Sequence, residues 1–117
     1  MQITISDAGL FSIRLGEHTR SVMDLEQLRE WIRHNPTTAM GDCRALGVIA
    51  GFLASRDLRA SGQTISASNA ARYMDEYYLV FGSGEANEAF SDGIAEGVDA
   101  VRLEATIPEV RDLVRRD

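Results

Sequence analysis

Residues 43–54 read Cys-Arg-Ala-Leu-Gly-Val-Ile-Ala-Gly-Phe-Leu-Ala, and this stretch decides the fold. Apart from Arg44 it is apolar on nearly every side, which is typical of a helix buried at the centre of a protein. Gly47 and Gly51 lie on one small-residue face of that helix. Because glycine inside a helix costs roughly 0.5–1 kcal/mol relative to alanine, we expect another helix to approach this face closely. One hypothesis is that a second copy of the chain supplies it, giving a homodimer through the Gly47/Gly51 face.

The chain before this helix has the alternating pattern of β-strands. Ile3 and Ile5 alternate with polar residues, a turn follows at 7–9, and residues 11–15 alternate again. These two runs predict a β-hairpin with one apolar face, and residues 19–22 could add a short third strand. Because a two-stranded hairpin is marginally stable alone, we expect it to pack on helices.

About five helices are expected, each beginning after a residue that can cap it. The candidate N-caps are Asp24, Thr37 or Thr38, Ser66 or Ser68, Ser83 and Thr106. Asp24 with Gln27, and Thr106 with Glu109, have the spacing of a capping box. The first four helices are expected to end near Asn35, Leu58, Phe81 and Gly97. Residues 98–105 fit either a strand that returns to the sheet edge or the end of a bent helix.

Together these patterns predict an α+β fold, in which a small N-terminal antiparallel β-hairpin or sheet packs on a bundle of about five helices. A length of 117 residues is typical of one domain, so we expect a single domain over residues 1–117. The hydrophobic fraction of 44% and the charged fraction of 26% are those of a globular protein. No membrane-spanning run and no secretory signal are expected, which predicts a cytoplasmic protein.

No catalytic motif is apparent. Cys43 is the only cysteine, so an intrachain disulfide and a cysteine-based zinc site are excluded. Its apolar surroundings indicate a small buried side chain rather than a nucleophile. His18 stands in a predicted turn and His34 at a predicted helix end, and both are expected to be surface residues. We therefore expect no catalytic residue, no metal and no cofactor.

The net charge of −6 comes from one part of the chain. Residues 73–101 contain seven acidic residues and no arginine, whereas the acidic and basic residues elsewhere almost cancel. All twelve basic residues are arginine. Because binding phosphates needs clustered cations, we expect no direct binding to nucleic acid.

Five of these acidic residues stand on the fourth predicted helix. Glu85, Glu88, Asp92, Glu96 and Asp99 are spaced three or four residues apart, so at 100° per residue they fall within an arc of about 80°. We call these five residues the acidic strip. Each adjacent pair of like charges destabilises a helix by about 0.2–0.5 kcal/mol, and no arginine of the same stretch relieves the repulsion.

The strip indicates a binding function. Our leading hypothesis is a non-enzymatic inhibitor or regulator that docks the strip on the basic surface of a nucleic-acid-handling protein, with Asp75, Glu76 and Tyr73 at its margin. Carboxylates about 5–6 Å apart have a spacing comparable to that of backbone phosphates. Small acidic inhibitors made by phages and mobile elements against host nucleases, CRISPR complexes or polymerases act in a similar way, by placing acidic residues on a nucleic-acid-binding surface. A phage-encoded protein of this kind would act in the host cytoplasm.

Three alternatives stay open from the sequence. The strip could be a solvated face that only aids solubility. A small enzyme or metal-dependent subunit could use Asp92 and Glu96 as ligands or acid–base groups. The chain could also be a structural subunit of a larger assembly.

Overall fold

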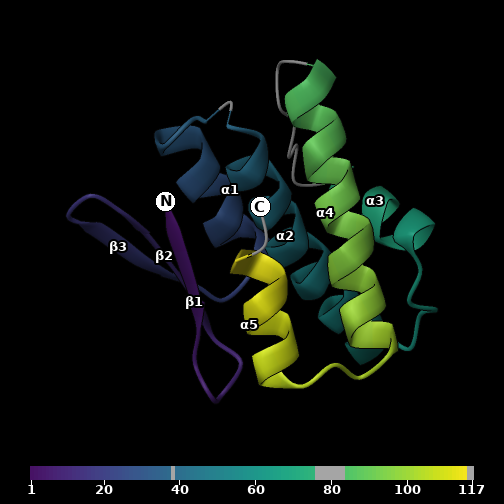
Figure 1. The fold of residues 1–117 in the computed structure, drawn as a ribbon. Coiled ribbons are helices and arrows are strands. Elements are labelled where there is room, and N and C mark those ends of the chain that lie inside the picture. The colour runs from purple at the N-terminus through teal and green to yellow at the C-terminus, as the bar shows by residue number, and fades with distance from the viewer. Residues whose placement is uncertain (38, 76–83, 116–117) are drawn as a thin grey trace.

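The computed structural model describes residues 1–37, 39–75 and 84–115, and within them it has three strands followed by five helices (Figure 1). The strands are β1 (Gln2–Ile5), β2 (Phe11–Leu15) and β3 (His18–Val22). The helices are α1 (Leu25–His34), α2 (Met40–Ala60), α3 (Ala67–Asp75), α4 (Gly84–Arg102) and α5 (Ile107–Arg115). This is the predicted α+β arrangement.

The strands form one antiparallel sheet in the order β1-β2-β3. Ile13 of β2 lies opposite Ile3 of β1 and Arg20 of β3. Since directly opposed residues share a face of the sheet, the alternation buries one face, where Ile3, Phe11, Ile13 and Val22 lie. α5 packs along β1, and α1 packs against β3.

Helix α2 is the centre of the molecule, as its apolar composition predicts, and α4 lies directly against it (Figure 1). A Cβ atom on Gly47 would meet the backbone carbonyl of Phe90, and one on Gly51 would meet that of Ile94. Residue numbers rise together along the contact, so α2 and α4 run in the same direction. Two neighbouring parallel helices need a connection that returns the chain to its starting end, and α3 lies within that connection.

The facing helix contributes its own glycines to the contact. A Cβ on Gly93 would meet the backbone of Arg44, and one on Gly97 would meet that of Val48. Two Gly-x-x-x-Gly faces therefore bring the two backbones into contact. Since α4 of the same chain already covers the Gly47/Gly51 face, a homodimer through that face would have to displace α4.

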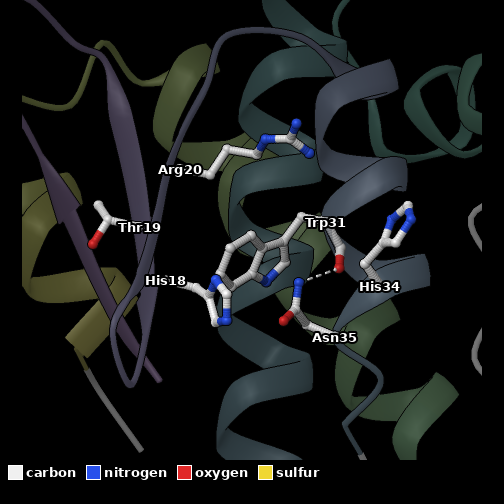
Figure 2. A pocket seen from close by; sticks show the side chains of 6 residues that line it. All are labelled: His18, Thr19, Arg20, Trp31, His34 and Asn35. Atoms are coloured by element: carbon white, nitrogen blue, oxygen red, sulfur yellow. Dashed lines mark hydrogen bonds between the residues drawn. The ribbon is translucent and has the colours of Figure 1, made fainter.

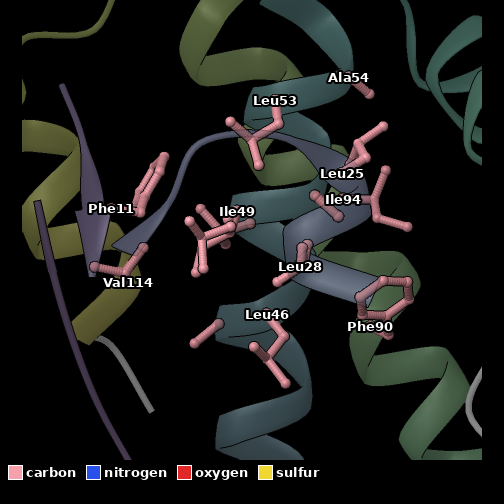
Figure 3. Packing of buried hydrophobic residues seen from close by; sticks show 14 of the residues in the cluster. Phe11, Leu25, Leu28, Leu46, Ile49, Leu53, Ala54, Phe90, Ile94 and Val114 are labelled. Atoms are coloured by element: carbon pink, nitrogen blue, oxygen red, sulfur yellow. The ribbon is translucent and has the colours of Figure 1, made fainter. Parts of the chain in front are cut away.

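The apolar side chains of the sheet and the helices meet around α2. Figure 3 shows Leu46, Ile49 and Leu53 of α2 at the centre of the cluster, with Phe11 of the sheet beside them. Leu28 of α1 completes this core, and all five side chains are buried. No helix in the described ranges is both long and apolar enough to cross a lipid bilayer.

Three helix starts agree with the predicted caps. The N–H of Gln27 donates to Asp24 Oδ1 over 2.8 Å, and the N–H of Asn69 donates to Ser66 Oγ over 3.1 Å. In the last capping box the Glu109 N–H donates to Thr106 Oγ1 over 3.3 Å. The side-chain caps at these three helix N-termini could therefore be predicted from the local sequence.

The predicted cap of α2 is wrong at Thr37. Ala39 occupies the N-cap position and forms no side-chain cap. Thr37 lies two residues too early, and its hydroxyl accepts a hydrogen bond from the Ala39 N–H over 3.2 Å. Thr38 and the predicted cap Ser83 lie outside the described residues.

The ambiguous segment 98–105 is mainly helical, because α4 continues to Arg102 instead of ending at Gly97. The buried residues Val98 and Val101 extend the inner face of α4. The alternative prediction, that this segment forms a strand, is therefore wrong. The described part of the third helix ends at Asp75, and residues 76–83 lie outside the described ranges.

Candidate functional site

The acidic strip lies on the outer side of α4, as its spacing predicts. Glu85, Glu88, Asp92 and Asp99 are exposed, and Glu96 is half-buried. The buried residues Ala86, Phe90, Gly93 and Gly97 are on the opposite side of the helix, against α2. The helical periodicity thus gathers the five carboxylates as expected.

The strip is not uniformly free of cations. The Arg44 guanidinium of α2 lies 2.8 Å from Glu96 Oε2, with only 14% of the arginine side chain and 29% of the glutamate side chain exposed. Arg44 also donates to the backbone carbonyl of Leu113 over 3.0 Å. The expectation that the whole strip is unrelieved is therefore wrong at Glu96. The reason is the close approach of α2, which brings an arginine from a distant part of the sequence beside α4.

Asp99 has a weaker partner. Arg102 of the same helix lies 3.5 Å from its carboxylate, and both side chains are more than half exposed. Exposed ion pairs of this kind contribute about 0.2–1 kcal/mol at most. The other three acidic residues of the strip lie in the N-terminal half of α4. Glu85, Glu88 and Asp92 form no ion pair with any residue that the structure describes. We call these three residues the exposed strip.

The residues predicted at the margin of the strip do not all lie there. The hydroxyl of Tyr73 donates to Asp57 Oδ2 over 2.9 Å, and its half-buried ring packs against the core. It therefore ties α3 to α2 instead of standing free at the surface. Asp75 is exposed at the described end of α3, and Glu76 lies outside the described residues.

A groove of about 260 Å³ lies between α3 and α4, beside the exposed strip. Met74, Phe90 and Ile94 line its apolar part. Asp75 lines it together with the polar side chains of Asn87 and Ser91. Asp75 lines this groove, whereas Glu85, Glu88 and Asp92 do not.

No group of three histidine, cysteine or acidic side chains in the described ranges could hold a metal ion. Of the pair considered for an enzyme, Asp92 is exposed and Glu96 is bound to Arg44. Cys43 is buried, and this burial, with the charge of Asp42, raises the pKa of its thiol.

The role of Arg44 is what reasoning from the sequence missed. It is the single charged residue within the apolar stretch 43–54, and an isolated arginine in a buried helix needs acceptors. That signal indicated a partner for Arg44. It could not indicate which carboxylate, because the pairing of α2 with α4 joins residues that are far apart in sequence.

A function for this chain has to be inferred from the side chains themselves. Comparison with known proteins found no family model, no curated protein and no solved structure that matches it.

Proposed function

We propose that this protein is a non-enzymatic binding protein that docks the exposed strip of α4 on the basic surface of a protein that handles nucleic acid. The supporting observation is that Glu85, Glu88 and Asp92 stand exposed in one row, unpaired by any described residue of a chain with twelve arginines. Adjacent like charges destabilise a helix by about 0.2–0.5 kcal/mol per pair. A cationic surface on a partner would turn that repulsion into attraction.

The packing of α4 suits such a role. Gly93 and Gly97 bring the inner side of α4 into backbone contact with α2, and the Arg44–Glu96 pair links the same two helices. The exposed strip therefore stands on a helix that is held along its inner side. A binding surface that is already ordered loses less conformational entropy on association.

The nature of the partner follows from the spacing of the charges. Carboxylates three and four residues apart on a helix lie about 5–6 Å from one another. Surfaces that bind nucleic acid present clustered lysine and arginine side chains to rows of phosphates. We propose that the exposed strip occupies such a surface and competes with nucleic acid, as the small acidic inhibitors of phages and mobile elements do.

The test compares capture of basic proteins by three immobilised forms of the protein. The first is the wild type. The second is a strip variant with Glu85→Gln, Glu88→Gln and Asp92→Asn. The third is a control variant that changes the net charge equally through Glu17→Gln, Glu104→Gln and Asp112→Asn, three exposed residues outside α4.

We expect the wild type and the control variant to retain nucleic-acid-binding proteins that the strip variant does not retain. Added DNA or RNA should displace them from the wild type. Equal retention by the strip variant would contradict the proposal. Equal loss from both variants would also contradict it, because net charge rather than the exposed strip would then govern binding.

A further inference from the structure

A second candidate site is a pocket of about 300 Å³ between β3 and the end of α1 (Figure 2). It is lined by His18, Thr19, Arg20, Trp31, His34 and Asn35. No acidic side chain lines it, although the chain has a net charge of −6. In Figure 1, β3 and α1 lie to the left of α2 and α4 lies to its right, so this pocket is separate from the exposed strip.

The sheet register places two of the basic side chains over α1. Arg20 lies opposite Ile13, and His18 lies opposite Leu15. Opposed residues share a face, so both side chains are on the face of the sheet that buries Ile13. Figure 2 shows the His18 ring beside the Trp31 indole and the Arg20 side chain extending above it, with Thr19 directed away. The core face of β3 thus changes from apolar at Val22 to polar at His18 and cationic at Arg20.

Trp31 supplies the buried part of the pocket. The residue is only 3% exposed, and its indole Nε1 has no hydrogen-bond acceptor among the residues that the structure describes. A buried donor without an acceptor costs about 1–3 kcal/mol. In Figure 2 the indole lies between the His18 ring and the Asn35 carboxamide, in the pocket itself. Less than 1 Å² of this nitrogen is accessible, so a group bound in the pocket reaches the N–H only after a neighbouring side chain moves aside.

Two carbonyl groups near the end of α1, those of Glu30 and Trp31, accept side-chain hydrogen bonds. The Trp31 carbonyl accepts from the backbone N–H of Asn35 over 2.9 Å and from its Nδ2 over 3.0 Å. The Glu30 carbonyl lies 2.8 Å from His34 Nδ1 and accepts a hydrogen bond from it. These bonds weaken the negative end of the helix at the pocket.

Arg20 provides a full charge. Its side chain is exposed and forms no ion pair with any described residue. Arginine is suited to carboxylate and phosphate because its guanidinium presents several donors in one plane. The Glu30 carboxylate lies 3.8 Å from His34 Nδ1 and also pairs with Arg29 and Arg33. Glu30 is therefore occupied outside the pocket.

We propose that this pocket binds a small molecule through an oxyanion, a phosphate or a carboxylate group. Arg20 supplies the charge, His18 flanks the bound group, and the Trp31 N–H is the buried donor. A volume of about 300 Å³ lies at the lower end of the range of small-molecule sites. The site is independent of the exposed strip, so it stands whether or not the proposed docking function is correct.

The single tryptophan of the chain provides the measurement. The indole N–H gives one signal in a proton–nitrogen correlation spectrum, and it is followed while inorganic phosphate or acetate is added at constant ionic strength, with chloride as the reference anion. We expect a saturable shift of this signal with phosphate, acetate or both, because the N–H gains an acceptor. The anion that produces a saturable shift of the indole signal identifies the class of oxyanion that the pocket binds.

Two variants test the role of the charge. Arg20→Gln should weaken the affinity for the saturating anion about tenfold, as expected when a charged hydrogen bond worth about 1.4 kcal/mol is lost. Arg14→Gln makes the same charge change on the opposite face of the sheet, where Arg14 lies opposite Thr19, and should leave the affinity unchanged. A shift that does not saturate, that chloride reproduces, or that Arg20→Gln leaves intact would overturn the proposal.

Discussion

Arg44 neutralises part of the acidic strip, although it is distant from the strip in sequence. In the sequence, the acidic strip is a row of carboxylates in a segment without arginine. In the structure, Arg44 lies 2.8 Å from Glu96, and Arg102 lies 3.5 Å from Asp99. The row itself was predictable, because it depends only on the period of a helix. The two ion pairs were not, since the first depends on tertiary packing and the second required α4 to extend to Arg102.

The repulsion within the exposed strip can be measured at Glu88, which has a like charge on either side. We expect Glu88→Gln to raise the free energy of unfolding by about 0.4–1 kcal/mol at low ionic strength, because two like-charge pairs are removed. Added salt should diminish the gain. Chemical denaturation checks this, with Asp112→Asn as the exposed control on α5. A loss of stability in Glu88→Gln would mean that its carboxylate has a stabilising partner.

Cys43 provides a prediction that depends on pH. Burial, with the charge of Asp42, raises the pKa of the Cys43 thiol in the folded protein. The unfolded chain then loses the thiol proton at a lower pH than the folded chain does, so stability falls as the pH rises above the ordinary thiol pKa of about 8.5. Cys43→Ala removes this contribution, and its unfolding free energy should fall less steeply with alkaline pH. Parallel slopes for the two proteins would contradict the assignment.

At the scale of elements, the contact between α2 and α4 organises the fold. The sequence indicated that Gly47 and Gly51 need a close neighbour, and the structure supplies α4 with Gly93 and Gly97 facing them. The need for a close neighbour could be predicted because it depends on the residues of a single helix. Its identity was not, since a facing helix can come from the same chain or from a second copy.

The close contact gives a sharp stability prediction at Gly51. A Cβ there would meet the backbone carbonyl of Ile94, and a backbone carbonyl cannot move aside as a flexible side chain can. We expect Gly51→Ala to lower the free energy of unfolding by about 1–3 kcal/mol, in spite of alanine's higher helix propensity. Gly84→Ala is the matched control, because a Cβ at Gly84 meets nothing within 4 Å. Thermal unfolding of both variants checks this, and a Gly51→Ala protein as stable as the Gly84→Ala protein would contradict the contact.

The starts of the elements were the most predictable feature, and their lengths the least. The caps at Asp24, Ser66 and Thr106 use contacts between residues three apart, which are visible in the sequence. The extension of α4 through residues 98–102 depends on Val98 and Val101 packing inside the molecule. The alternating pattern of that segment was equally compatible with a strand, so tertiary packing decided between them.

For the whole molecule, two surfaces with opposite charge lie on different elements. The exposed strip of α4 is acidic, whereas the pocket between β3 and α1 is lined by Arg20 and two histidines without a carboxylate. The histidines were expected at the surface, and each is exposed. The sequence could not show that they line one pocket, because that depends on β3 lying beside the end of α1.

The most direct measurement of the docking function is the rate of association with a captured basic partner as ionic strength increases. Opposite charges accelerate encounter by about tenfold or more at low salt. We predict that the rate constant of the wild type falls steeply with added salt toward the value for the Glu85→Gln, Glu88→Gln, Asp92→Asn variant, whose own rate changes little. The same steep salt dependence in that variant would contradict the claim that these three carboxylates guide binding.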